Sequence, residues 1–155
     1  MLLDGFNHVA ILTKDTDRLH AFYRDVFDAV VRRDGAESRE KQDVRLSIID
    51  VGPHSELNVF EITDNTEAEH QTPMFGRGRI DHLALHASSL DAFETIRERL
   101  IARGAADTFV TDFGPILSVF FRDPDGLECE LCVANPDARL GVSNPPGTPA
   151  ARYVT

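Results

Sequence analysis

The sequence has few of the features that mark nucleic-acid-binding, membrane or disulfide-stapled proteins. It has only two cysteines and therefore no disulfide framework. No apolar run approaches the roughly 18 residues that a membrane-spanning helix needs. Lys and Arg number 16 against 26 Asp and Glu, which gives a net charge of -10 without a basic cluster. Such a surface repels phosphate, so we expect neither a nucleic-acid nor a membrane partner.

The two cysteines, Cys129 and Cys132, form a C-x-x-C pattern inside GLECELCV. This alternation predicts a strand, whereas a redox-active pair lies at a helix N-terminus. Residues three apart on a strand point to opposite faces, so we expect two unpaired thiols. The N-terminal stretch MLLDGFNH has neither the basic nor the long apolar segment of a secretory signal, which predicts a cytoplasmic protein.

Two successive halves of the chain show the same order of predicted elements. In the first half we expect a strand at 6–12, a helix that begins near 15–17, and strands at 28–33, 44–50 and 56–63. In the second half we expect a strand at 80–87, a helix from Ser88 or Ser89 to Gly104, and strands near 108–111, at 116–122 and at 127–133. The pattern predicts an α+β fold of two paired βαβββ modules.

The predicted domain covers residues 1–134. Its modules are residues 5–63 and 80–134, and the polar segment 64–79 connects them. Residues 135–155 are rich in proline and predict an irregular tail.

Four polar residues occupy matching places in the two halves. His8 and His82 lie in the first strands, and Glu61 and Glu130 lie in the last strands. The alternation of strand faces predicts that all four point away from the apolar face that packs on the helices. Imidazoles suit Zn, Ni, Co or Fe, and carboxylates tolerate Mg or Mn, so this set can bind a divalent cation. The alternative is four unrelated polar residues on a solvated face.

Several motifs of the chain resemble those of the vicinal oxygen chelate superfamily. They are FNHVAILTKDTDRLHAFYRDVF, LNVFEITDN, GRIDHLALHA and FFRDPDGLECEL, and the resemblance covers residues 5–134. The superfamily includes glyoxalase I, extradiol dioxygenases, methylmalonyl-CoA epimerase, fosfomycin-resistance enzymes and metal-free bleomycin-binding proteins. The resemblance implies a glyoxalase-like cup that holds one divalent metal through His8, Glu61, His82 and Glu130. The cup forms within one chain or across a homodimer.

The residue at position 61 bears on the reaction that the resemblance implies. Glyoxalase I has a Glu there, extradiol dioxygenases use only two His and one Glu, and the epimerase has Gln. Glu61 therefore implies a glyoxalase I-like lyase or isomerase in which Glu130 or Glu61 moves a proton on a small bidentate oxygen substrate. The ion would be Zn, Ni, Co, Mn or Fe. Two alternatives remain: an Fe(II) dioxygenase using His8, His82 and Glu130, and a small-molecule binding protein without turnover.

The motif departs from glyoxalase I at one substrate-binding position. Leu12 stands where glyoxalase I has an arginine that contacts glutathione, although Asn65 matches the asparagine after the ligand Glu. A buried carboxylate needs a cation, which Leu12 does not supply. We therefore predict a substrate other than a glutathione adduct, unless Arg77 or Arg79 takes that role. His86 faces the same side as His82 and is a candidate acid or base.

Overall fold

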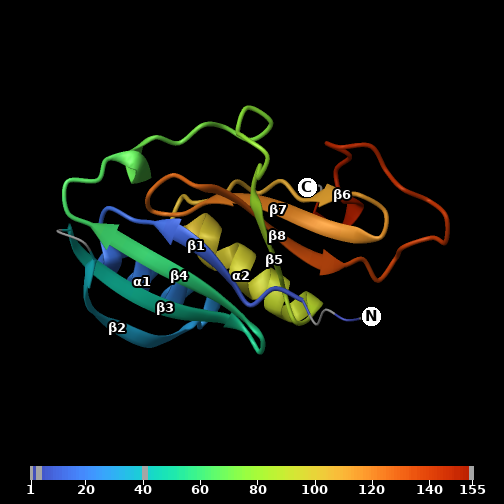
Figure 1. Cartoon of the computed structure of the whole chain (residues 1–155). Helices are drawn as coiled ribbons and strands as arrows, with labels where there is room; N and C mark the ends of the chain where they lie inside the picture. Colours follow the sequence, from blue (N-terminus) through green and yellow to red (C-terminus); the bar gives the residue numbers. More distant parts are fainter. Residues whose placement is uncertain (1, 3–4, 40–41, 154–155) are drawn as a thin grey trace. The chain divides into compact units, whose positions relative to one another are not determined.

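The computed structural model describes residue 2, residues 5–39 and residues 42–153. The chain divides into two compact units, residues 1–71 with 124–126 and residues 72–123 with 127–155. Each unit contains a four-stranded sheet and one α-helix (Figure 1). The predicted α+β fold of two βαβββ modules is confirmed.

The first unit has the sheet order β1-β4-β3-β2. Strand β1 pairs parallel with β4, and the other pairs are antiparallel. The elements are β1 His8–Leu12, α1 Thr16–Phe27, β2 Val30–Arg39, β3 Gln42–Gly52 and β4 Ser55–Ile62, followed by the 3-10 turn η1 Glu67–Glu69. Strand β2 is longer than the predicted 28–33.

Helix α1 begins where the carboxylate of Asp15 caps it by accepting a hydrogen bond from Arg18 N at 2.9 Å. It ends at Asp28, which adopts a left-handed conformation with φ 53°. The buried stripe of the helix lies against one face of the sheet, where Ile49, Leu57 and Val59 are at most 1% exposed. We call this the helix-covered face of the first sheet.

The second unit repeats this arrangement with the sheet order β5-β8-β7-β6. Strand β5 pairs parallel with β8, and the remaining pairs are antiparallel. The elements are β5 Leu83–His86, α2 Leu90–Ala102, β6 Thr111–Asp112, β7 Ile116–Arg122 and β8 Glu128–Ala134. Ser89 caps α2 by accepting from Ala92 N at 3.0 Å. Phe93 and Leu100 of this helix are fully buried.

The two faces of the second sheet differ in composition. Cys129, Leu131 and Val119 are buried on one face. The alternation of the strands places another set on the opposite face, which we call the Glu130 face: Ala84, His86, Ser118, Phe120, Glu130 and Cys132.

Residues 135–153 are irregular but pack on the second unit. Pro149 forms a bridge with Thr111, and Ala150 N donates to Val110 O at 2.8 Å. The chain then forms the 3-10 turn η2 Ala151–Tyr153, in which the hydroxyl of Tyr153 donates to Glu94 at 3.2 Å. These contacts fasten the tail to helix α2 and strand β6.

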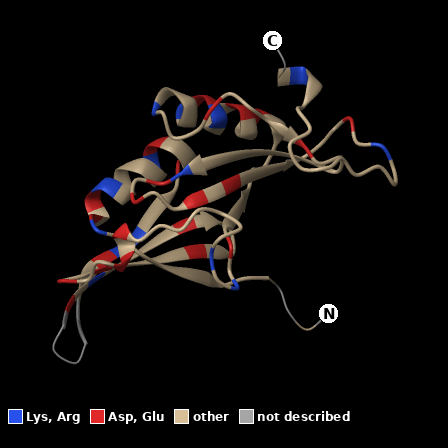
Figure 2. Cartoon of the chain, turned by 90° about the horizontal axis from the view of Figure 1, so that it is seen from above, with Lys and Arg blue, Asp and Glu red and all other residues tan. Residues whose placement is uncertain are grey.

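Among the described residues, no helix is long and apolar enough to cross a membrane. Acidic and basic residues are interspersed along both α-helices (Figure 2).

Candidate metal centre

Glu130 is a buried carboxylate in the middle of the second sheet. It is 8% exposed, and its neighbours across the sheet are Ala84 on β5 and Phe120 on β7. The hydroxyl of Ser118 donates a hydrogen bond to Glu130 Oε1. An ionised carboxylate in such surroundings requires hydrogen bonds or a cation to offset its lost hydration.

His82 lies beside this carboxylate. It directly precedes β5, and its Nε2 lies 3.2 Å from Glu130 Oε2. The other ring nitrogen, Nδ1, lies 2.7 Å from Asp81 Oδ2. The hydrogen bond with His82 is the main reason that the pKa of Asp81 is lowered. The structure therefore brings together the two residues that the second-module motif predicts, His82 and Glu130.

The thiol of Cys132 also lies on the Glu130 face. Burial, and secondly the charge of Glu130, raise the pKa of Cys132 to about 12. Burial likewise raises the pKa of Cys129 to about 12 on the opposite face. Both cysteines are free, which confirms the predicted unpaired thiols. The Cys132 thiol is therefore protonated at neutral pH while no ion is bound.

In the first unit, His8 lies at the start of β1 and is exposed, with its Nδ1 2.7 Å from Asn7 Oδ1. It pairs with Glu56 across the sheet. Leu12 pairs with Phe60, and alternation places both on the same face as His8. Leu12 therefore brings an apolar side chain to this face.

The predicted face of Glu61 is wrong. Glu61 lies two residues after Val59 and four after Leu57, so it shares their helix-covered face. His8 lies on the opposite face, because it pairs with Glu56 on β4. Its Oε2 accepts a hydrogen bond from Thr16 N at the start of α1, at 2.8 Å. Glu61 therefore interacts with the positive end of a helix.

The register identifies Asn58 as the counterpart of Glu130 in the first sheet. Ala10, two residues after His8, pairs with Asn58, and Ala84, two residues after His82, pairs with Glu130. The Oδ1 atom of Asn58 is buried and accepts no hydrogen bond from the described residues. Sequence reasoning missed Asn58, although a single polar residue inside the apolar run LNVF was a usable signal.

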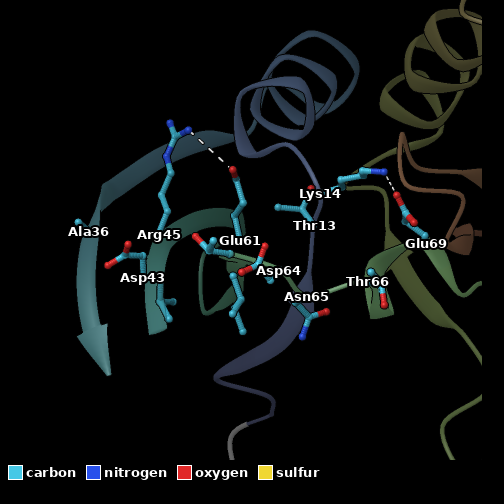
Figure 3. Close-up of a pocket in the computed structure, with 13 residues that line it drawn as sticks. Thr13, Lys14, Ala36, Asp43, Arg45, Glu61, Asp64, Asn65, Thr66 and Glu69 are labelled. Carbon is cyan, nitrogen blue, oxygen red and sulfur yellow. Dashed lines mark ion pairs between the residues drawn. The ribbon is translucent and has the colours of Figure 1, made fainter. Parts of the chain in front are cut away.

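A cavity of about 570 Å³ opens beside Glu61 (Figure 3). Ion pairs join Lys14 to Glu69 and Arg45 to Glu61 across its lining, the second at 3.9 Å. Asp43 and Asp64 also line the cavity. Its charges are of both signs.

Another group of potential ligands lies between α1 and the first sheet. Atoms of Asp17, His20 and Asp34 lie within 4.8 Å of one another. Arg45 bonds both carboxylates at 2.7 Å, and these hydrogen bonds are the main cause of their lowered pKa values. His20 Nε2 lies 2.5 Å from Ser47 Oγ. The Arg45 guanidinium bonds both carboxylates and offsets one of their two negative charges, so the cluster is held as an ion-pair network.

Comparison with known proteins identifies relatives of this fold. The profile of the Glyoxalase/Bleomycin resistance protein/Dioxygenase superfamily matches residues 5–131. A glyoxylase/bleomycin resistance protein/dioxygenase domain from Frankia sp. EAN1pec superposes with a TM-score of 0.66 at 22% identity, covering 87% of this chain and 95% of that one. No curated protein matches the chain.

Two further solved structures share the fold. The fosfomycin resistance protein FosX from Listeria monocytogenes, solved with Mn(II) and sulfate, has a TM-score of 0.58 at 17% identity over 90% of this chain and 99% of its own. Lactoylglutathione lyase from Agrobacterium tumefaciens has a TM-score of 0.56 at 20% identity over 86% of this chain and 96% of its own. At these identities the likeness concerns the fold.

Proposed function

The chain belongs to the Glyoxalase/Bleomycin resistance protein/Dioxygenase superfamily, and we propose that it is an enzyme dependent on one divalent metal. We propose lyase or isomerase chemistry on a small substrate that offers two neighbouring oxygens. The observation that carries the proposal is the pair formed by His82 Nε2 and the buried Glu130 carboxylate, 3.2 Å apart. A superfamily relative, FosX, has been solved with Mn(II).

The donors on the Glu130 face fit a borderline or hard divalent ion. Imidazole nitrogen and carboxylate oxygen suit Mn, Fe, Co, Ni and Zn. We propose His82 and Glu130 as ligands from the second module. From the first module we retain His8 and replace Glu61 by Asn58, whose buried Oδ1 lacks a hydrogen-bond donor among the described residues.

The chemistry of Glu130 follows from its hydrogen bonds. When bound, a divalent ion supplies Lewis-acid catalysis by polarising a substrate oxygen. Ser118 donates to Glu130 Oε1 and holds the carboxylate in place, so Oε2 is the atom that can take a proton. In the proposed reaction, Glu130 removes a proton from the carbon beside the paired oxygens and returns it to the neighbouring position. Glu61 has no part in this step.

The substrate class is limited by the side chains near Glu130. Phe120 is 39% exposed on the Glu130 face and offers an aromatic surface. Arg122 also lies toward this face, but its guanidinium bonds Glu128 at 2.8 Å. We therefore propose an uncharged substrate with an apolar or aromatic body, rather than a phosphonate or a peptide-like thiol adduct.

A second candidate is favoured by Asn58. If Asn58 takes the place of a carboxylate, the proposed set contains two histidines, His8 and His82, and one carboxylate, Glu130. Two histidines and one carboxylate form the set used by non-heme Fe(II) oxygenases. Oxygen-dependent cleavage of a catechol-like substrate is therefore the alternative.

Metal titration tests the proposed centre. Metal-free protein is titrated with Mn(II) or Zn(II), and His82→Ala and Glu130→Gln are compared with His54→Ala, an exposed histidine in the turn between β3 and β4. We expect one tight ion per chain in the wild type and in His54→Ala, and loss of tight binding in the other two variants. A wild type without tight binding contradicts the proposal.

Reaction class is tested with a panel of uncharged compounds: hydroxyketones, hydroxyaldehydes and catechols. Proton-transfer chemistry runs without oxygen on redox-inert Zn and exchanges substrate hydrogen for solvent deuterium. Strict dependence on Fe(II) with oxygen uptake selects the dioxygenase. Tight binding of a panel compound without conversion selects a binding protein.

A further inference from the structure

Asp81 makes two directed contacts beside the proposed metal ligand His82. Its Oδ2 lies 2.7 Å from His82 Nδ1, and its Oδ1 accepts a hydrogen bond from Phe75 N at 2.5 Å. Each carboxylate oxygen therefore has its own partner. The carboxylate cannot rotate without breaking one of these bonds.

The loop 72–80 that supplies this second contact is itself fastened to strand β8. The Arg77 side chain is 10% exposed, and its Nη1 donates to Asp81 O at 2.9 Å and to Glu128 O at 3.2 Å. Met74 N donates to Glu128 Oε2 at 2.7 Å. Glu128 lies two residues before Glu130. The loop thus ties Asp81 to the strand that carries the carboxylate ligand.

A neutral imidazole carries one proton, and only its other nitrogen has a lone pair for a metal. The hydrogen bond at one nitrogen decides which tautomer forms. Here the contact from Nδ1 to Asp81 is 2.7 Å, whereas the contact from Nε2 to Glu130 is 3.2 Å. The shorter contact favours the proton on Nδ1, which leaves the Nε2 lone pair for a cation held between this nitrogen and the Glu130 carboxylate.

We propose that Asp81 is a positioning residue that holds His82 in the Nδ1–H tautomer, with Nε2 directed toward the Glu130 carboxylate. The inference rests on the proposed function, which makes His82 a metal ligand. Partners of this kind fix the ring orientation and raise the basicity of the ligating nitrogen. In this protein, the braced loop 72–80 holds the partner itself in place.

Metal affinity gives the first test. We expect Asp81→Ala to weaken Mn(II) binding about 10- to 100-fold, as loss of such a partner does in other metal sites. Asp81→Asn keeps an oxygen acceptor for Nδ1–H and should lose less. The matched control is Asp107→Ala, since Asp107 accepts a local bond from Phe109 N at 2.8 Å. If Asp81→Ala binds Mn(II) as tightly as the wild type, the proposal is overturned.

A purely structural role for Asp81 would act through the loop. Arg77→Gln removes the guanidinium contacts of the loop but leaves the Asp81 carboxylate intact. We expect Arg77→Gln to lower thermal stability while weakening Mn(II) binding less than Asp81→Ala. Equal loss of affinity in Arg77→Gln and Asp81→Ala would show that loop order alone matters, and would overturn the proposal.

The tautomer can be read directly by nitrogen NMR of the His82 ring, with the signals assigned through His82→Gln. In metal-free protein at a pH where the imidazole is neutral, we expect Nδ1–H in the wild type and a shift toward Nε2–H in Asp81→Ala. A wild-type ring in the Nε2–H form overturns the inference. This readout is independent of the metal proposal, which fails separately if His82→Ala and Glu130→Gln bind Mn(II) normally.

Discussion

Thr16 N donates a hydrogen bond to Glu61 Oε2 at 2.8 Å, so this carboxylate faces the first turn of α1. The contact satisfies one of the backbone N–H groups that every helix leaves unpaired at its start. A carboxylate at this place also interacts favourably with the helix dipole. Glu61 therefore contributes to helix stability, and its negative charge is directed away from the face that bears His8.

Replacing Glu61 should consequently affect folding more than metal binding. We expect Glu61→Ala to lower the free energy of unfolding by about 0.5–1 kcal/mol, the range for a lost helix N-terminal hydrogen bond at a partly exposed site. Urea denaturation measures this loss. The Mn(II) affinity should stay at the wild-type value, and a variant that no longer binds metal would restore Glu61 as a ligand.

Replacing Asn58, in contrast, should raise the free energy of unfolding. Its buried Oδ1 has no donor among the described residues, and an unsatisfied buried polar group costs about 1–3 kcal/mol. Asn58→Leu should therefore raise the unfolding free energy of the metal-free protein by about 1 kcal/mol, because Leu has a similar volume and no polar atom. A less stable Asn58→Leu variant would show that the amide is satisfied.

The buried His20 predicts a pH dependence of stability. Burial is the main cause of its lowered pKa, so the folded protein binds the His20 proton less readily than the unfolded chain does. Stability from this group is therefore present above pH 6.5 and is lost as the pH falls toward the lower folded pKa.

The test compares the wild type with His20→Gln by urea unfolding between pH 8 and pH 5. We expect the stability advantage of the wild type over His20→Gln to shrink as the pH falls. The charged groups that influence His20 are present in both proteins, so their own titration affects both alike: Asp17, Arg24, Asp34 and Arg45. An advantage that grows toward low pH would contradict the prediction.

Glutathione-dependent turnover should be absent. Leu12 brings no charge to its face, and of the two proposed substitutes, Arg77 and Arg79, the first is committed to Asp81 O and Glu128 O. Metal-loaded protein supplied with methylglyoxal and glutathione should form no thioester. Turnover in the ordinary enzyme range of roughly 1 to 1000 per second would refute this.

Gly114 should be intolerant of a side chain. Its φ is +97°, and an added Cβ would lie 2.5 Å from Val142 O in the tail. We expect Gly114→Ala to cost about 1–3 kcal/mol through backbone strain and to loosen residues 135–153. Faster proteolysis within the tail, compared with Gly147→Ala, would report the loosening. Gly147 also has a positive φ, of +82°, but no neighbour within 4 Å of its Cβ position.

The elements of the fold were predictable because their signals are local. The apolar stripe of α1 and the cap at Ser89 lie within a few residues of sequence. The face of Glu61 was not predictable in this way. Strand β4 has apolar residues on both sides, Leu57 and Val59 on one and Phe60 and Ile62 on the other, so alternation alone allows either face. Sheet register and burial against α1 decide between them.

The proposed site residues also divide into those with a local sequence signal and those without one. Glu130 could be placed because β8 alternates clearly, with Cys129 and Leu131 buried on the other face. His82 directly precedes β5, whose alternation is equally local. Asp81 stands next to His82 in the sequence, yet the role we propose for it depends on Phe75 N, in a loop whose path no local pattern gives.

The turn between β7 and β8 carries Asp125, whose side chain is 4% exposed and belongs to the first unit. Asp125 accepts hydrogen bonds from Thr13 Oγ1 at 2.5 Å and from Arg18 Nη2 at 2.6 Å. A gene fragment that ends after residue 71 would therefore encode the first unit without residues 124–126, which belong to it. Each half of a split chain should need the other to become fully folded, so the chain is suited to a complementation reporter in which both fragments must meet.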